Sequence, residues 1–439
     1  MGIKVAFVPL YHSDYPFDVA KRFVKEAVSR LREKDINVLL CQEVCEKSCV
    51  EGAVKSITSY RPDSIVFFVA TWTEAPNAVS LALELSHYPL VVWGLRMYYE
   101  NGKRESTGSL PGASVLKASL EAIGLKPFFV VGMPNEPATI DKVYTICLAS
   151  SAVRKIREAK IGLVGYASMG MYTAMFDPFS LRKVFGVDVV HIDTSEVFKE
   201  MSGVKATEAS SVADSWRKKY FIESDVSEED LVNAAKIYIA LRNLVEKYKL
   251  SSITVKCQYE FSKDLGFVPC VPLSVLADEG VVSSCEGDVL LTLTMLMLHY
   301  LTNQPIYYGD LVDIRGNKVY LSSCGFAPLT LSAEKTMGIG RHKYFFKGLR
   351  SGIVLKKGEV TLARIGLVAG EYRLHVALGE VVETELRQRL FPAAEVELKG
   401  DVEAFIENVM SQHYALAYGD LRKYLKILAR ILELKYIET

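Results

Sequence analysis

Apolar segments alternate with amphipathic ones along the first 130 residues, and this alternation restricts the fold more than any other feature of the sequence. The apolar segments carry hydrophobic residues at consecutive positions, as strands do when both faces of a parallel sheet are covered. We therefore expect a parallel sheet with helices on both of its faces. The predicted strands are residues 3–10, 36–40, 64–70, 89–95 and 127–132, and the predicted helices are residues 18–34, 50–60, 76–88 and 111–124.

A second set of the same kind follows a helical stretch at residues 138–158. Its predicted strands are residues 160–166, 187–193 and 251–258, with helices at 194–201 and 226–248. From about residue 303, strands and Gly-containing turns follow one another without helices, which is typical of an antiparallel sheet or small barrel. An amphipathic helix is predicted over residues 419–437.

The expected fold is therefore α/β, with two doubly wound α/β lobes followed by a β-rich, barrel-like C-terminal domain. The predicted domains are residues 1–155, residues 156–302 and residues 303–439. The second of these ends in the apolar helix that follows a Cys-Glu-Gly-Asp segment.

The charge balance argues against two classes of partner. Lys and Arg together number 52, as do Asp and Glu, so the formal net charge is zero. Nucleic-acid binding needs a basic face that displaces counterions, and an anionic membrane attracts the same kind of face. The first residues are typical of a strand and not of a targeting segment, and the longest apolar helical run, residues 290–301, is too short to cross a bilayer. We expect a cytoplasmic protein that binds neither nucleic acid nor membrane.

Eight cysteines occur, and Cys41, Cys45 and Cys49 recur at intervals of four residues. On a helix they would form one stripe, but a structural zinc site usually has four ligands and no nearby Cys or His supplies the fourth. We interpret them as ordinary buried thiols. Their redox state stays open, because intracellular disulfides do occur in hyperthermophiles.

The chemistry-bearing residues cluster late in the chain. None of the seven histidines forms the i, i+4 pair of a helical zinc motif, and no G-x-S-x-G segment occurs. Cys285-Glu286-Gly287-Asp288 stands directly before a strongly apolar helix. Asp288 is placed to cap that helix, so that Asn should serve there almost as well. Glu286 precedes the cap, and Asp310 is predicted to end an apolar strand, where acids often face a ligand crevice.

In this combination the residues resemble the L-fucose/L-arabinose isomerase superfamily. The motifs that carry the resemblance are Cys-Glu-Gly-Asp at 285–288, Asp310, Cys-Gly-x-Ala-Pro at 324–328, and His413 with Gly419 and Asp420. They cover residues 281–439; the earlier part is matched by its two α/β lobes and by residues 106–112 and 161–166. Gln412 and Ser323 depart from the pattern, because relatives often have histidine at both positions.

The resemblance implies Mn²⁺ held by Glu286, Asp310 and His413, with Mg²⁺ or Co²⁺ as substitutes. Gln258 stands where the family has a glutamine that contacts substrate. The implied reaction interconverts an aldose and a ketose of the L-fucose/L-arabinose type through an enediolate, with a cation that polarises the carbonyl and with Glu286 and Asp310 as acid–base candidates. Which sugar reacts, and which carboxylate carries the proton, stays open.

The resemblance also implies a homo-oligomer, a trimer or hexamer, in which the N-terminal lobe of a neighbour completes the active site. Trp72, Trp93, Tyr98 and Tyr99 are candidates for that surface, although Trp93 fits the core of the first sheet equally well. No Arg or Lys cluster adjoins the three proposed ligands, so we expect an unphosphorylated pentose or 6-deoxyhexose. Two alternatives stay open: a non-catalytic sugar-binding protein, and a metal-dependent sugar lyase or aldolase.

Overall fold

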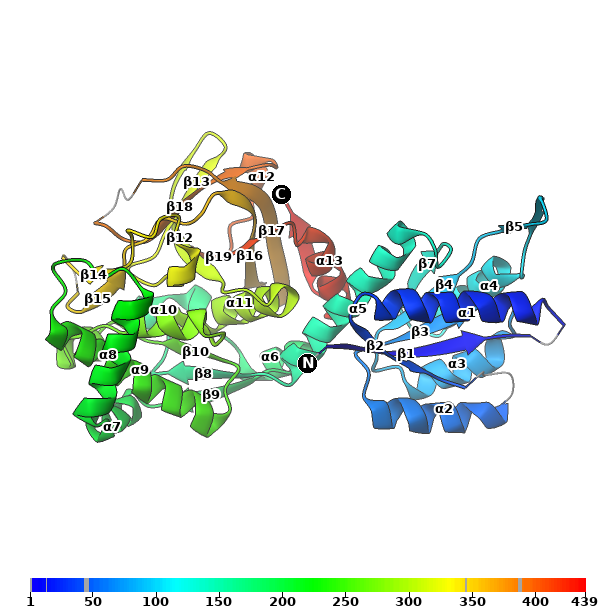
Figure 1. Cartoon of the computed structure of the whole chain (residues 1–439), viewed down its shortest axis with the longest axis horizontal. Coiled ribbons are helices and arrows are strands. Elements are labelled where there is room, and N and C mark those ends of the chain that lie inside the picture. Colours follow the sequence, from blue (N-terminus) through cyan, green and yellow to red (C-terminus); the bar gives the residue numbers. More distant parts are fainter. Residues whose placement is uncertain (1, 13, 43–46, 344–345, 386–388) are drawn as a thin grey trace. The chain divides into compact units, whose positions relative to one another are not determined.

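The computed structural model describes residues 2–12, 14–42, 47–343, 346–385 and 389–439. Contacts divide the chain into two compact units, residues 1–154 and residues 155–439, and each is described by itself (Figure 1).

The first unit is a parallel sheet in the order β2-β1-β3-β4-β7. Helices α2, α3 and α4 pack their apolar residues on one face of it, while α1 and α5 lie on the other (Figure 1). The strands are β1 (Ile3–Leu10), β2 (Ile36–Leu40), β3 (Ser64–Val69), β4 (Leu90–Gly94) and β7 (Phe128–Val131), and the helices are α1 (Phe17–Arg32), α2 (Lys47–Tyr60), α3 (Ala75–Glu84), α4 (Ser109–Ala122) and α5 (Pro137–Arg157). All the strands and helices predicted for this part are confirmed.

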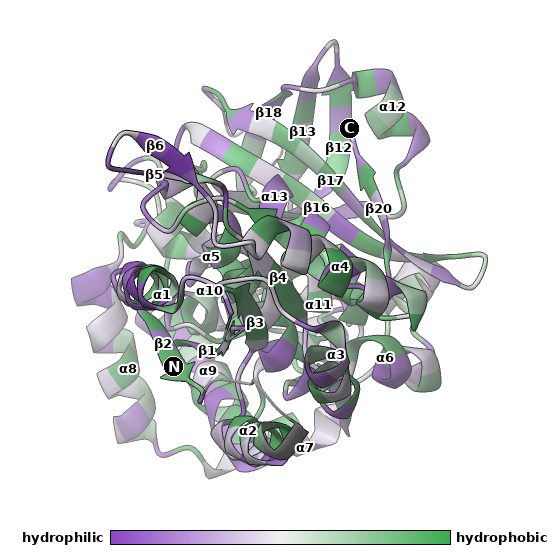
Figure 2. Ribbon diagram, turned by 90° about the vertical axis from the view of Figure 1, so that its right-hand side faces the viewer, coloured by the Kyte–Doolittle hydropathy of each residue, from purple (hydrophilic) through white to green (hydrophobic). Residues whose placement is uncertain are grey.

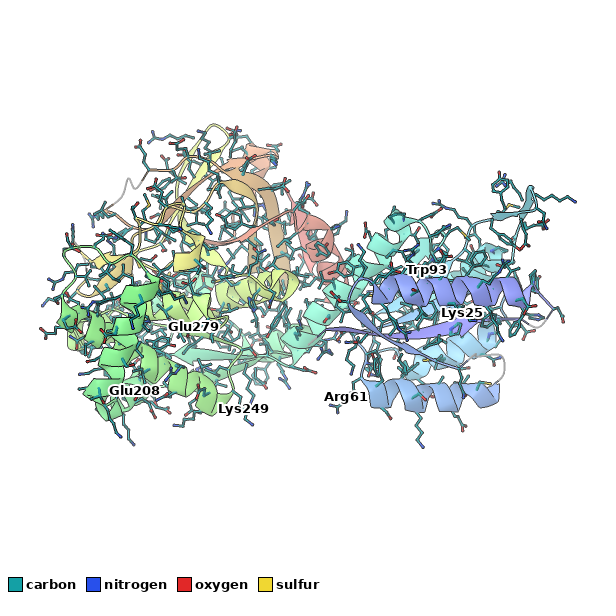
Figure 3. All side chains as sticks on the ribbon, in the orientation of Figure 1. Lys25, Arg61, Trp93, Glu208, Lys249 and Glu279 are labelled. Atoms are coloured by element: carbon teal, nitrogen blue, oxygen red, sulfur yellow. The ribbon has the colours of Figure 1, made fainter. Side chains whose placement is uncertain are left out.

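The aromatic residues proposed for an interface do not all reach the surface. Trp93 is fully buried and packs edge-on against Phe7 and Phe68 in the sheet core (Figure 3). The interface interpretation of Trp93 is therefore wrong. Tyr99, by contrast, is 74% exposed on a hydrophilic hairpin formed by β5 (Tyr98–Glu100) and β6 (Lys103–Glu105) (Figure 2).

The second unit begins with a four-stranded parallel sheet in the order β11-β10-β8-β9. Its strands are β8 (Lys160–Val164), β9 (Asp188–Ile192), β10 (Ser252–Val255) and β11 (Val282–Cys285); its helices are α6 (Pro178–Phe185), α7 (Thr194–Gly203), α8 (Ala206–Lys219), α9 (Glu228–Tyr248), α10 (Cys270–Asp278) and α11 (Val289–Thr302). The sequence patterns missed α6, α8, α10 and β11.

The rest of the second unit is a closed antiparallel barrel. Its strands follow one another in the order β16-β19-β12-β13-β18-β17, and β17 pairs back with β16. The barrel strands carry both hydrophobic and hydrophilic residues (Figure 2). The strands are β12 (Tyr307–Arg315), β13 (Lys318–Ser322), β16 (Gly358–Val368), β17 (Glu371–Val381), β18 (Ala393–Leu398) and β19 (His413–Tyr418); β14 (Ile339–Arg341), β15 (Leu349–Ser351), α12 (Val402–Glu407), α13 (Arg422–Ile431) and β20 (Lys435–Glu438) complete the unit.

Helix α11 joins the parallel sheet to the barrel. It contacts β8, β10 and β11 on the sheet and β16 and β19 on the barrel. Residues 289–298 are all buried. This double coverage explains why the helix is apolar on every side, whereas a surface helix has one apolar stripe.

The fold class predicted from the sequence is thus confirmed, with corrections of detail. The terminal amphipathic helix ends at Ile431 and not at residue 437, because Glu433 takes a φ of 56° and residues 435–438 form β20 beside β17. The domain division predicted at residues 155 and 302 stays a prediction, and residues 155–439 pack as one unit.

Cys41 and Cys49 are free thiols, one buried and one half-buried, as interpreted from the sequence. Cys41 follows β2 and Cys49 lies in α2, so they share no helix; Cys45 lies outside the described residues. Burial raises the pKa of the Cys41 thiol to about 12. Among the described helices, none is both long enough and apolar enough to cross a membrane.

Candidate active site

A cavity of about 450 Å³ opens in the second unit, and two of the three predicted metal ligands line it. The loops that follow β8, β10 and β11 contribute to one wall, as expected for the carboxyl ends of parallel strands. Strand β12 and the residues that follow β13 contribute to another wall. The lining residues are Met169, Met171, Gln258, Glu286, Asp310, Val312, Ser322, Ser323, Cys324, Phe346, Phe391 and Gln412.

Glu286 sits in a tight link between β11 and α11. Its φ is 68°, a left-handed conformation that is costly for a residue with a side chain and is often found at functional sites. Gly287 follows with a φ of 69°, and a Cβ there would lie 2.2 Å from the carbonyl oxygen of Tyr166. The backbone nitrogen of Ser168 donates to the carbonyl oxygen of Glu286 at 2.9 Å. The turn therefore requires glycine at position 287, and it holds Glu286 in a strained backbone conformation.

Asp310 and His413 lie side by side on neighbouring strands of the barrel. They are directly paired in the antiparallel register of β12 and β19, an arrangement that places opposed side chains close together. Asp310 lies inside β12 and not at its end, which corrects the prediction. A β-bulge lies between Leu311 and Asp313, and irregularities of this kind re-aim side chains near active sites. Val312 lines the cavity together with Asp310.

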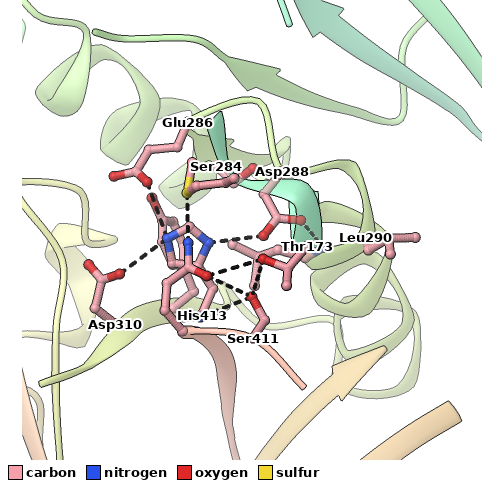
Figure 4. Close-up of polar contacts among 12 residues, drawn as sticks. Thr173, Ser284, Glu286, Asp288, Leu290, Asp310, Ser411 and His413 are labelled. Carbon is pink, nitrogen blue, oxygen red and sulfur yellow. Dashed lines mark hydrogen bonds and ion pairs between the residues drawn. The ribbon is translucent and has the colours of Figure 1, made fainter. Parts of the chain in front are cut away.

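The three predicted ligands meet at one nitrogen atom (Figure 4). Nε2 of His413 lies 3.3 Å from Oε2 of Glu286 and 3.3 Å from Oδ1 of Asp310. It is buried, and it makes a well-directed hydrogen bond with neither carboxylate nor with any other described residue. A buried polar atom without a partner is costly, and two carboxylate oxygens and an imidazole nitrogen are a suitable donor set for a divalent cation. The residues therefore fit the metal site that the resemblance implies.

The other ring nitrogen of His413 is held by Asp288. Nδ1 lies 2.9 Å from Oδ2 of Asp288, so Nδ1 carries the proton that is donated and Nε2 faces the two carboxylates. Arg364 of β16 donates two hydrogen bonds to the same carboxylate, at 2.9 and 3.2 Å. Arg364, Asp288 and His413 are all fully buried. Oδ1 of Asp288 also accepts from the backbone nitrogen of Leu291 at 2.9 Å, which confirms the predicted cap of α11.

The charges of the side chains at the site do not cancel. Arg364 balances Asp288, which leaves the carboxylates of Glu286 and Asp310; no Lys or Arg occurs among the described residues of the lining. Burial raises the pKa of Glu286. Burial also favours the neutral form of Asp288, but Arg364 and His413 outweigh it and hold the pKa of Asp288 at about 2. Burial alone would lower the pKa of His413, yet hydrogen bonding to Asp288 and the nearby carboxylates of Asp310 and Glu286 raises it well above its usual value. The site thus attracts positive charge.

Gln258, predicted as a substrate contact, also lines the cavity. Its side chain is 7% exposed, and its Oε1 has no hydrogen-bond partner among the described residues. The structure therefore brings all four predicted site residues into one region. The sequence did not show that Asp288 also binds His413. An aspartate before a helix has the same appearance in the sequence whether it only caps the helix or also binds a histidine.

We expect Asp288→Asn to be severe, contrary to the inference from the cap alone. The amide still caps α11, but it leaves the Arg364 charge unpaired and presents no carboxylate to Nδ1 of His413. The free energy of unfolding should fall by about 3–5 kcal/mol, as for a broken buried ion pair. Affinity for a divalent cation should fall ~10–100-fold, as for lost partners of ligating histidines. Urea unfolding and calorimetric titration with Mn²⁺ measure the two effects.

Asp401→Asn is the matched control for Asp288→Asn. Asp401 caps α12 in the same way, accepting from the backbone nitrogen of Ala404 at 3.1 Å, and its side chain is exposed. Because Asn caps a helix about as well as Asp, this change should alter neither stability nor cation binding. If the two variants behave alike, Asp288 is a cap only.

Comparison with known proteins points to the same kind of chemistry. No family model matches the sequence. Proteins named sulfoquinovose isomerase are similar to it over almost their full length: that of Priestia aryabhattai is 27% identical over 446 residues, 98% of each chain, and that of Alkalicoccus urumqiensis is 26% identical over 444 residues, 99% of each chain. A solved periplasmic solute-binding protein of Actinobacillus succinogenes with bound D-allose covers 69% of this chain and 92% of its own, but its 11% identity and TM-score of 0.19 are too low to support an inference. The chain is thus similar from end to end to proteins named as sugar isomerases.

Proposed function

We propose that this protein is a metal-dependent aldose–ketose isomerase, with Mn²⁺ held by Glu286, Asp310 and His413. The observation that supports it best is the unpartnered Nε2 of His413, 3.3 Å from an oxygen of each carboxylate at the wall of the cavity. The full-length similarity to sulfoquinovose isomerases agrees with it. Oxygen ligands with one imidazole suit Mn²⁺, with Mg²⁺ or Co²⁺ as substitutes.

A divalent cation at this position would polarise the substrate carbonyl and offset the negative charge that develops during the reaction. The chain's own groups would move the proton. Isomerisation through an enediolate requires one carbon to lose a proton and its neighbour to gain one, and Glu286 and Asp310 both reach the cavity. Positioned acid–base groups of this kind contribute about 10²–10⁴-fold to the rate. Glu286 is the more enclosed of the two, with 11% of its side chain exposed against 36% for Asp310.

The remaining lining residues suit a sugar. The unpartnered Oε1 of Gln258 can accept a hydrogen bond from a substrate hydroxyl, which would satisfy a buried acceptor. Phe346 and Phe391 offer ring faces for the C–H surfaces of a sugar ring, and Met169 and Met171 give an adaptable apolar wall. Orientation by a few polar groups on an apolar wall is typical of small-molecule sites.

The lining also bears on the substrate's charge. The described lining holds two carboxylates and no Lys or Arg. An anionic group on the substrate would therefore meet no counter-ion in the lining. We therefore propose an unphosphorylated, uncharged sugar of the L-fucose or L-arabinose type. Sulfoquinovose, the substrate in the relatives' name, is a sulfonated sugar, so the comparison of the two sugars is informative.

The two alternatives receive less support. A metal-dependent lyase or aldolase that acts on a sugar phosphate would need a basic group near the three ligands, which the described lining does not contain. A non-catalytic sugar-binding protein would need no imidazole nitrogen without a hydrogen bond between two carboxylates.

Isomerase activity can be tested directly. We expect the purified protein with Mn²⁺ to convert at least one aldose of a panel of L-fucose, L-arabinose and sulfoquinovose into its ketose, and in D₂O to place deuterium at C2 of the recovered aldose. Removal of metal with EDTA should abolish turnover, and Mn²⁺ should restore it, because the ligands are two carboxylates and an imidazole. Full activity after exhaustive chelation, or cleavage fragments in place of ketose, would contradict the proposal. A preference for sulfoquinovose over the neutral sugars would contradict the uncharged substrate only.

The division of labour among the three ligands gives a second test. Glu286→Gln and Asp310→Asn remove both a ligand and a proton carrier, so each should stay ~10²–10⁴-fold less active even at saturating Mn²⁺. His413→Asn removes a ligand alone and should recover part of its rate as Mn²⁺ is raised. Steady-state rates across a Mn²⁺ series measure this. Asp313→Asn is the matched control, because Asp313 lies on the same strand but pairs with Arg315 outside the lining; it should behave as wild type.

The proposed trimer or hexamer has its own test. An exposed Tyr99 is compatible with an interface that supplies residues of the N-terminal lobe to a neighbour's site. Light scattering at assay concentration should give a mass of three or six chains. An active monomer would refute the shared site.

A further inference from the structure

Four cysteines from distant parts of the chain gather beside Glu286. Cys257 follows β10, Cys270 begins α10, Cys285 ends β11 and Cys324 follows β13. All four are free thiols, and the neighbouring thiols of Cys257, Cys270 and Cys285 hold the pKa of Cys324 well below its usual value. Cys324 and Glu286 also line the cavity, so an ion in solution can reach them.

Two of these thiols and Glu286 are close enough to share an ion. Sγ of Cys285, Sγ of Cys324 and a carboxylate oxygen of Glu286 all lie within 4.8 Å of one another. Two sulfur atoms bound to one ion at ~2.3 Å can be at most about 4.6 Å apart, so at most a small shift of rotamers brings them into range. Among the described residues, these three side chains form a group with metal-binding spacing.

The two oxygens of Glu286 face different donor sets. Oε2 lies 3.3 Å from Nε2 of His413, on the side of Asp310. Oε1 lies 3.8 Å from Sγ of Cys324. One carboxylate therefore stands between a hard oxygen and nitrogen set and a soft sulfur set. Soft thiolates select ions such as zinc, whereas carboxylates suit manganese and magnesium.

We propose that Cys285, Cys324 and Oε1 of Glu286 form a second cation site, selective for thiophilic divalent ions such as Zn²⁺ and Cd²⁺. Each thiol releases its proton to solvent as its sulfur coordinates the ion. The hydroxyl of Tyr308, 2.6 Å from Sγ of Cys285, then donates a hydrogen bond to the thiolate and fixes its position. Because the two sites share the single charge of Glu286, an ion on the thiols weakens the binding of an ion by His413 and Asp310. This inference rests on the contacts and does not depend on isomerase activity.

Cadmium titration tests the site. Reduced, metal-free protein should develop the near-ultraviolet sulfur-to-cadmium charge-transfer band and saturate at one Cd²⁺ per chain. The band should be lost in Cys285→Ser and in Cys324→Ser. Cys147→Ser is the matched control: Cys147 is a buried thiol of the first unit, 3.6 Å from Oγ of Ser64, and its removal should leave the band unchanged. Absence of the band at stoichiometric Cd²⁺, or its survival in both site variants, would overturn the proposal.

Two further measurements keep the test decisive. If a serine variant does not fold by circular dichroism, ¹¹³Cd NMR of the wild-type protein decides, because a resonance in the sulfur-bound range supports the site and one in the oxygen and nitrogen range refutes it. With Mn²⁺ bound first, Cd²⁺ should release it, seen as the paramagnetic resonance signal of free Mn²⁺. Retention of Mn²⁺ while the sulfur-to-cadmium band forms would refute the competition between the two sites for Glu286. If the protein shows the band but has no isomerase activity, the isomerase proposal is contradicted and the thiol site is supported.

Discussion

The buried carboxylate of Asp288 holds the site together. It caps α11, forms a bidentate ion pair with Arg364 of β16, and fixes Nδ1 of His413 on β19. Buried charges are stable only when they are paired and hydrogen-bonded, so none of the three side chains can move away without stranding the others. One carboxylate thereby ties the helix of the parallel sheet to two strands of the barrel.

Helix α11 makes this link possible. Sheet contacts on one side and barrel contacts on the other leave its residues 289–298 no solvent-facing side. Its N-terminus is therefore fixed in the interior, and the chain must reach it from β11 by the left-handed turn at Glu286 and Gly287. Close packing of Gly287 on the carbonyl of Tyr166 leaves no room for a side chain at that position. The strain at Glu286 is thus sustained by packing that fixes it on both sides, as expected for strained residues at functional sites.

Much of this could be predicted from the sequence because the signals are local. Consecutive apolar residues predict the strands of the parallel sheets, and Asp288 before an apolar run predicts a cap. The features that were missed depend on distant partners. The ion pair of Asp288 with Arg364 joins positions 76 residues apart. The continuation of β12 beyond Asp310, with its bulge after Leu311, depends on pairing with β13. The gathering of Cys257, Cys270, Cys285 and Cys324 depends on the contact of the parallel sheet with the barrel, so their spacing in the sequence carries no sign of it.

The two proposed cation sites share the carboxylate of Glu286, so each kind of ion binds at the expense of the other. A hard cation gains from the charge of Glu286 and Asp310, which no described Lys or Arg in the lining offsets. A soft cation binds more tightly to the sulfur atoms of Cys285 and Cys324, and it uses the charge of the same Glu286. Selection between hard and soft cations then depends on how rigidly the His413 ring is held. An imidazole fixed through Nδ1 loses less conformational freedom on binding an ion than a mobile one. Asp288 fixes His413 and Arg364 fixes Asp288, so we expect this buried ion pair, which is outside the cavity, to favour the proposed oxygen and nitrogen site over the proposed thiol site.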